Sequence, residues 1–314
     1  MPLAAGRSIP GRHRASPTTL QRVIRLDAAT VLLQWAVGGM AFCWFTTRRR
    51  QVGLGYGWML RGTYVLLGVG ALAAAWRYDP APVRDVATVL FVVAVAVALV
   101  VSIARRRAGV SGQLAEHDRR TARVAAMTGI ERERDETAEA RGPEFPPILD
   151  LVPVAFGVIG LVAAGFDAAP DGGGDAVVAV LRTLVGAAFL GAVTDAMLLG
   201  HWYLVQPGLP RKLLNEIVTA LGWIWPLEIV VLLLPPGMIG VLTGSIDDGW
   251  GGTLGWFWLA CALMTIVLVF VTRAALRERE YSAVMAATGL LYLAILTAFG
   301  TDLVARAVLD NAAA

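Results

Sequence analysis

Long apolar segments dominate this sequence and decide its fold class. About eight of them are long enough to cross a bilayer as helices, since about twenty residues at 1.5 Å per residue span the hydrocarbon. Of all 314 residues, 57% are hydrophobic and only 16% are charged. Strands are excluded, because an open sheet edge in lipid leaves backbone groups without hydrogen bonds. We therefore predict an all-α, polytopic integral membrane helix bundle.

One charged segment divides the predicted bundle. We expect an arginine-rich, disordered tail (1–27), three spans (28–104), a charged helical connector (105–147), five spans (148–306) and a short C-terminal tail (307–314). The expected spans are 28–47, 57–76, 84–104, 148–166, 176–205, 213–235, 252–274 and 282–306. No internal repeat is visible, which disfavours a transporter built from inverted repeats.

Basic residues in the connections set the expected orientation. With eight spans, the same side holds Arg48–Arg50, the nine arginines of 105–147, Arg211 with Lys212, and Arg277 with Arg279. Basic loops are retained in the cytoplasm, so this side is predicted to be cytoplasmic and both termini to face outward. The arginine-rich tail is the one feature that opposes this orientation. We expect a multi-pass protein of the bacterial plasma (inner) membrane.

The connector 105–147 is the only sizeable polar segment between spans. Its first half is basic with a narrow apolar stripe, and its second half alternates charges as a solvated helix does. Our main interpretation is a helical connector that lies on anionic lipid. The alternative is a docking site for soluble partner subunits. We expect no nucleic-acid partner.

Ionisable residues inside the spans are costly and often functional. Arg182 and Glu228 lie at similar depth in consecutive spans, so we predict that they form an ion pair. Asp302 and Arg306 are four residues apart and can pair on one helix face. A structural role is the default for both pairs. Arg61 and Asp150 lie near span ends, where either side chain can snorkel to water.

A single histidine lies in a predicted span, and aromatic residues surround it in the sequence. One interpretation is an interfacial aromatic belt. The other is a quinone and proton site, in which a histidine or tyrosine binds a ring oxygen and a carboxylate passes protons. The candidates for this site are His201, Asp195, Tyr203, Trp202, Trp223 and Trp225. One histidine excludes a bis-histidine haem held by this chain alone, and we find no metal-ligand or nucleotide motif.

Three functions fit these features. The first is a quinone-interacting or anchoring subunit of a bacterial respiratory complex, with quinone as its only expected cofactor and partner chains beside it. The second is a small-molecule or ion transporter that uses Asp195, Glu228 and Arg182 as coupling groups. The third is a non-catalytic assembly or scaffold protein that docks a partner on 105–147. Without a catalytic motif, an accessory membrane subunit is favoured over a stand-alone enzyme.

Overall fold

The computed structural model describes residues 27–128, 143–169, 172–206, 208–278 and 280–312, and these residues contain helices and no strand. Within this described part of the chain, eight helices are long and apolar enough to span a membrane. The prediction of an all-α polytopic bundle is confirmed. The eight are α2 (Ala28–Thr47), α3 (Leu54–Tyr78), α4 (Pro82–Ala104), α6 (Leu151–Asp167), α7 (Gly173–Val205), α8 (Arg211–Leu233), α10 (Thr253–Ala275) and α11 (Tyr281–Ala312).

Shorter helices complete the described chain: α5 (Ser111–Thr128), α9 (Met238–Leu242), and the 3₁₀ turns η1 (Arg106–Ala108) and η3 (Pro147–Asp150). Helix α11 continues to Ala312, where we expected a tail. The predicted disorder of the N-terminal tail falls on residues 1–26, outside the described residues. The same holds for 129–142, the charge-alternating half of the connector.

Helices α2 and α7 form the centre of the bundle. They cross at Gly38 and Gly191, where a methyl group on Gly38 would lie 1.7 Å from the carbonyl oxygen of Ala187. Only glycine permits this backbone-to-backbone approach, which is how membrane helices gain packing energy without a hydrophobic driving force. Together with α3 and α6, which also pack on α2, this crossing makes α2 the most deeply buried of the eight spans.

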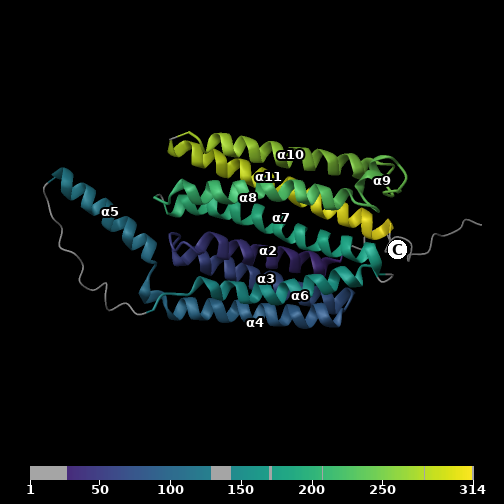
Figure 1. Ribbon diagram of the computed structural model, residues 1–314, viewed down its shortest axis with the longest axis horizontal. Helices are drawn as coiled ribbons and strands as arrows, with labels where there is room; N and C mark the ends of the chain where they lie inside the picture. Colours follow the sequence, from purple (N-terminus) through teal and green to yellow (C-terminus); the bar gives the residue numbers. More distant parts are fainter. Residues whose placement is uncertain (1–26, 129–142, 170–171, 207, 279, 313–314) are drawn as a thin grey trace, which may run out of the picture.

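The remaining spans pack on the two sides of this central pair (Figure 1). Helices α3, α4 and α6 pack on one side, and α8, α10 and α11 pack on the other. Helix α5 projects from one end of the bundle, while α9 and the C-terminus lie at the opposite end (Figure 1). The described half of the connector is therefore helical, as its amphipathic pattern predicted.

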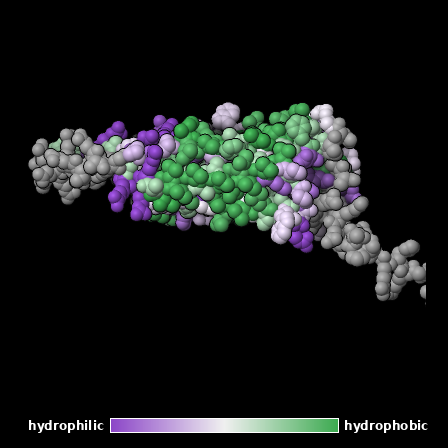
Figure 2. Space-filling model, turned by 90° about the horizontal axis from the view of Figure 1, so that it is seen from below, coloured by the Kyte–Doolittle hydropathy of each residue, from purple (hydrophilic) through white to green (hydrophobic). Residues whose placement is uncertain are grey.

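A continuous apolar belt covers the face seen in Figure 2, and hydrophilic residues gather at its two ends. We name these ends by their charges. The basic end carries Arg48, Arg105, Lys212 and Arg277, and the acidic end carries Asp79, Asp167 and Asp247. The chain is thus a multi-pass membrane protein. Its membrane of residence, and the side that each end faces, stay predictions.

Candidate functional site

Two carboxyl groups and one guanidinium are buried together toward the acidic end of the bundle. Glu228 comes from α8, and Asp302 and Arg306 come from α11; we call these three residues the carboxyl cluster. Glu228 and Asp302 have no solvent exposure. The Nε of Arg306 lies 3.0 Å from both carboxylate oxygens of Asp302. The predicted contact between Asp302 and Arg306 is therefore formed.

Glu228 differs from Asp302 in having no hydrogen-bond donor. Within the described residues, neither of its carboxyl oxygens accepts a hydrogen bond from an N–H or hydroxyl group, and the one side chain within hydrogen-bond range is the carboxyl of Asp302. Asp302, Arg306 and Arg182 lie within electrostatic range of it. Arg306 already donates to Asp302 and, at 2.9 Å, to the carbonyl oxygen of Arg182. Glu228 therefore lies beside a cation whose hydrogen bonds go to other groups.

The space for the carboxyl cluster comes from a glycine on α7. A methyl group at Gly186 would lie 2.6 Å from Oδ1 of Asp302, 2.8 Å from a terminal nitrogen of Arg306 and 2.8 Å from Nε2 of Gln34. Gln34 donates from that nitrogen to the carbonyl oxygen of Thr183 at 2.9 Å. The cluster thus lies where α2, α7, α8 and α11 meet.

Arg182 does not form the predicted ion pair with Glu228, and that prediction is wrong. Its guanidinium donates instead to three backbone carbonyl oxygens at and just after the end of α8. These belong to Val231 at 3.0 Å, Leu234 at 2.6 Å and Pro236 at 2.6 Å. The last carbonyl groups of a helix lack intrahelical donors, and a guanidinium carries five N–H groups in a fixed fork. The end of α8 at Leu233 therefore takes up the donors of Arg182.

A second buried carboxyl lies on α7, nearer the basic end. Asp195 has no solvent exposure and accepts a hydrogen bond on one oxygen from the Tyr64 hydroxyl of α3. Its other oxygen has no partner among the described residues. Gly39 on α2 makes room for this contact, since a methyl group there would lie 2.0 Å from the Tyr64 ring. The Tyr56 hydroxyl lies within electrostatic range of Asp195.

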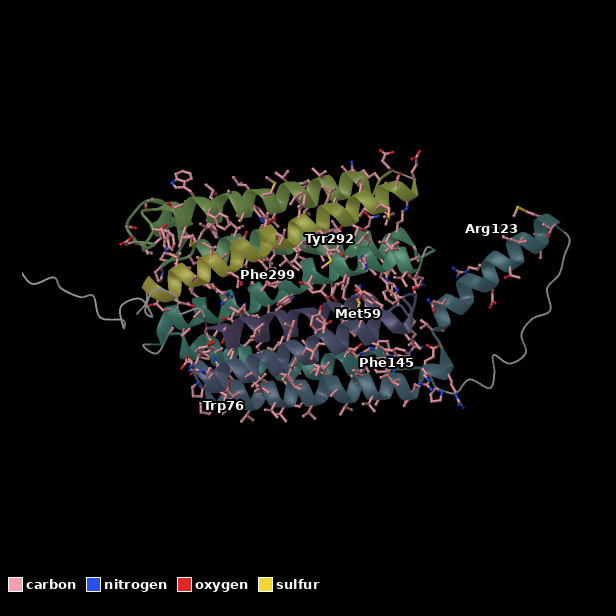
Figure 3. The ribbon with its side chains drawn as sticks, turned by 180° about the vertical axis from the view of Figure 1, so that it is seen from behind. Met59, Trp76, Arg123, Phe145, Tyr292 and Phe299 are labelled. Atoms are coloured by element: carbon pink, nitrogen blue, oxygen red, sulfur yellow. The ribbon has the colours of Figure 1, made fainter. Side chains whose placement is uncertain are left out.

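A fully satisfied ion pair lies at the basic end. Arg61 on α3 donates to both oxygens of Asp150 at 2.7 Å, and the two side chains are 3% and 0% exposed. The guanidinium also stacks on the Phe145 ring, 4.3 Å from its centroid (Figure 3). The expectation that either residue snorkels to water is therefore wrong: the pair bridges α3 to η3 inside the protein.

A small cavity adjoins this ion pair, with Arg61 and Ser102 in its lining. Its volume of about 40 Å³ has room for a few water molecules.

The six residues predicted to bind a quinone do not meet in one place. His201 lies on the bundle surface, where its Nδ1 is 3.3 Å from the hydroxyl of Tyr292 on α11. Tyr292 is labelled in Figure 3. Tyr203 is buried and donates to the carbonyl oxygen of Pro210 at 2.6 Å. Asp195 lies with Tyr64, on another side of α7. The predicted histidine, tyrosine and carboxylate therefore do not face a shared cavity.

The three tryptophans of that prediction are also separated. Trp202 packs on the Tyr56 ring and donates to Gln206 at 3.1 Å. Trp225 donates to the carbonyl oxygen of Ala262 at 3.0 Å. Trp223 is 73% exposed and faces outward. Each indole thus has its own environment, as in the interfacial interpretation.

Sequence reasoning missed Gln34, which lies with the carboxyl cluster around Gly186, and Tyr64, which donates to Asp195. Gln34 carried a readable signal, since an amide inside a predicted span needs a partner. Tyr64 carried none, because tyrosine is common in membrane helices. In the described part of the chain, no group of three metal-ligating side chains comes together.

Comparisons with protein-family models, with curated proteins and with solved structures find no match. The function must therefore be argued from the buried groups themselves.

Proposed function

We propose that this chain is a proton-handling membrane transporter whose carboxyl cluster takes up and releases a proton during each cycle. One observation carries the proposal: Glu228 is fully buried, no N–H or hydroxyl group of the described residues donates to its oxygens, and it lies within hydrogen-bond range of Asp302, which already holds the nearest guanidinium. Two ionised carboxyls at this depth repel each other and are poorly solvated. Binding a proton removes both costs, and releasing it restores them.

The depth of the cluster suits such a role. Glu228 lies five residues from the end of α8, or about 8 Å along the helix axis, so it is inside the bundle yet near one aqueous side. The exposed Asp310 of α11 lies within electrostatic range of Arg306. A carboxyl group therefore lies between the carboxyl cluster and the water at the acidic end, where it can relay a proton. Intramembrane carboxyls in such positions are typical of proton relays.

Asp195 supplies a second proton acceptor along the same central helix. It lies nine residues from Gly186, or about 14 Å along α7. One of its oxygens is free to accept a proton. One acceptor is therefore on α7 and the other packs against it at a different depth. This arrangement fits a transporter in which a movement of α7 exposes one carboxyl region to water at a time.

The other two hypotheses have less support. A quinone site would need His201, Tyr203 and Asp195 to face one pocket, and they do not. A scaffold would have no need of a buried carboxyl without a donor. The quinone and its partner chains stay predictions, and no observation raises them above transport.

Proton flux in liposomes tests the proposal. The purified chain is reconstituted with a trapped pH-sensitive dye, and a potassium diffusion potential drives proton entry. We expect uptake in the wild type and loss of uptake in Glu228→Gln. The matched control is Glu216→Gln on the same helix, whose carboxylate is 25% exposed and pairs with Arg49 at 2.7 Å. Equal uptake by wild type and Glu228→Gln would contradict the proposal.

A further inference from the structure

An open groove of about 420 Å³ runs along the basic end of the bundle between α2 and α8. Phe45 and Arg48 line it from the end of α2. One face of α8 lines the rest, because the contributing residues recur every three or four positions: Lys212, Asn215, Glu216, Thr219, Ala220 and Trp223. None of these residues belongs to the carboxyl regions described above.

The groove is cationic at its mouth. Arg48 stacks on the Phe45 ring at 3.9 Å, and neither Arg48 nor Lys212 has a carboxylate at ion-pair distance within the described chain. The one carboxylate in the lining, Glu216, is bound by Arg49 at 2.7 Å. Two cations therefore remain for an anion that enters the groove.

The groove is apolar at its other end. Trp223, 73% exposed, lies eleven residues beyond Lys212, or about 17 Å along α8. That length matches the distance from the headgroups to the middle of a bilayer whose hydrocarbon is about 30 Å thick. The cations thus lie at the depth of a lipid headgroup, and the aromatic side chain lies at the depth of its acyl chains.

We propose that this groove binds one glycerophospholipid with an anionic headgroup. The phosphate lies between Arg48 and Lys212, and an acyl chain lies along Ala220 and Trp223. A free phosphate would leave the apolar half of the groove unused. A neutral lipid or quinone would leave both cations without a counter-charge.

Binding is measured with the full chain in detergent, as saturable quenching of tryptophan fluorescence by brominated phosphatidylglycerol. We expect saturation at one lipid per chain for phosphatidylglycerol and much weaker quenching by brominated phosphatidylcholine. Two lost cation contacts predict that the dissociation constant of Arg48→Gln/Lys212→Gln rises about 30-fold. In Trp223→Phe, the quenchable fraction falls, because this indole lies beside the acyl chain.

The charge-matched control is Arg273→Gln/Arg277→Gln, which removes two cations at the basic end outside the groove. It should bind phosphatidylglycerol as the wild type does. Lys212→Glu alone provides a second variant if the double one does not elute as a folded species. Three outcomes would overturn the proposal: equal binding of the two lipids, equal weakening in the control, or full competition by inorganic phosphate.

Discussion

Two buried carboxyls, Asp150 near the basic end and Glu228 toward the acidic end, have opposite surroundings. At the basic end, Arg61 and Asp150 are matched one to one, with two hydrogen bonds of 2.7 Å between them. Toward the acidic end, Glu228 shares its surroundings with Asp302, yet its oxygens have no donor. Buried polar groups in proteins are nearly always hydrogen-bonded. A structural role is enough to explain the pair of Arg61 and Asp150. It does not explain Glu228, and we attribute that residue to proton binding.

Neutralising the satisfied carboxyl should have the largest effect on stability. Asp150→Asn leaves the Arg61 guanidinium buried with an uncharged partner, and breaking a buried pair costs about 3–5 kcal/mol. We expect the free energy of unfolding, from titration with sodium dodecyl sulfate in mixed micelles, to fall by about the lower of these values.

The control for this prediction removes both charges at once. Arg61→Met/Asp150→Leu should recover most of the lost stability, because a hydrophobic pair of similar volume replaces a buried ion pair at little cost. If Asp150→Asn were as stable as the wild type, Asp150 would not be a structural residue, and the contrast with Glu228 would be wrong.

The central crossing, on which both ends depend, should come next. In Gly38→Ala the new methyl group meets the carbonyl oxygen of Ala187, and overpacking costs about 1–3 kcal/mol. Proton flux should fall together with stability, since both carboxyl regions pack against α2 and α7. Gly62→Ala in α3 is the matched control: no atom lies within 4 Å of its new methyl group, so its stability should be unchanged or higher. Equal losses in both variants would rule out the crossing as their cause.

The fold could be predicted from the sequence, whereas the pairing of its charges could not. Apolar runs of span length report the helices directly, and the spacing of Asp302 and Arg306 places both on one helix face. Arg61 and Asp150 are 89 positions apart, so only the tertiary fold brings them together. Arg182 was assigned to Glu228 by depth alone, but the carbonyl groups at the end of α8 compete for its donors.

The residues predicted to bind a quinone are separated for a related reason. His201 and Tyr203 lie within one turn of each other on α7, whereas Trp223 lies twelve residues into α8, about 18 Å from its start. Closeness in sequence does not fix the direction in which a side chain points. His201 faces the bundle surface, and Tyr203, two residues later, faces the interior. A helix turns by about 100° per residue, so neighbours in sequence rarely line one pocket.

Asp195 is intermediate between the two ends, since one of its oxygens has a donor and the other has none. In Asp195→Asn the Tyr64 hydroxyl still donates, but to a neutral amide oxygen, so a charge-assisted bond becomes an ordinary one. We expect a loss of about 1 kcal/mol in the free energy of unfolding. Tyr64→Phe should cost a similar amount, and the double variant should cost little more than either. Fully additive losses would show that the two side chains act independently.

Glu228→Gln should have the smallest effect on stability and the largest on transport. The wild-type carboxyl has no donor to lose, and the neutral amide removes its repulsion with Asp302. We therefore expect the free energy of unfolding to change by less than about 1 kcal/mol, or to rise, while proton uptake is lost. A residue retained only to hold the fold would behave in the opposite way, as Asp150 should. If Glu228→Gln destabilised the protein as much as Asp150→Asn does, Glu228 would be a structural residue, and its role would be the same as that of Asp150.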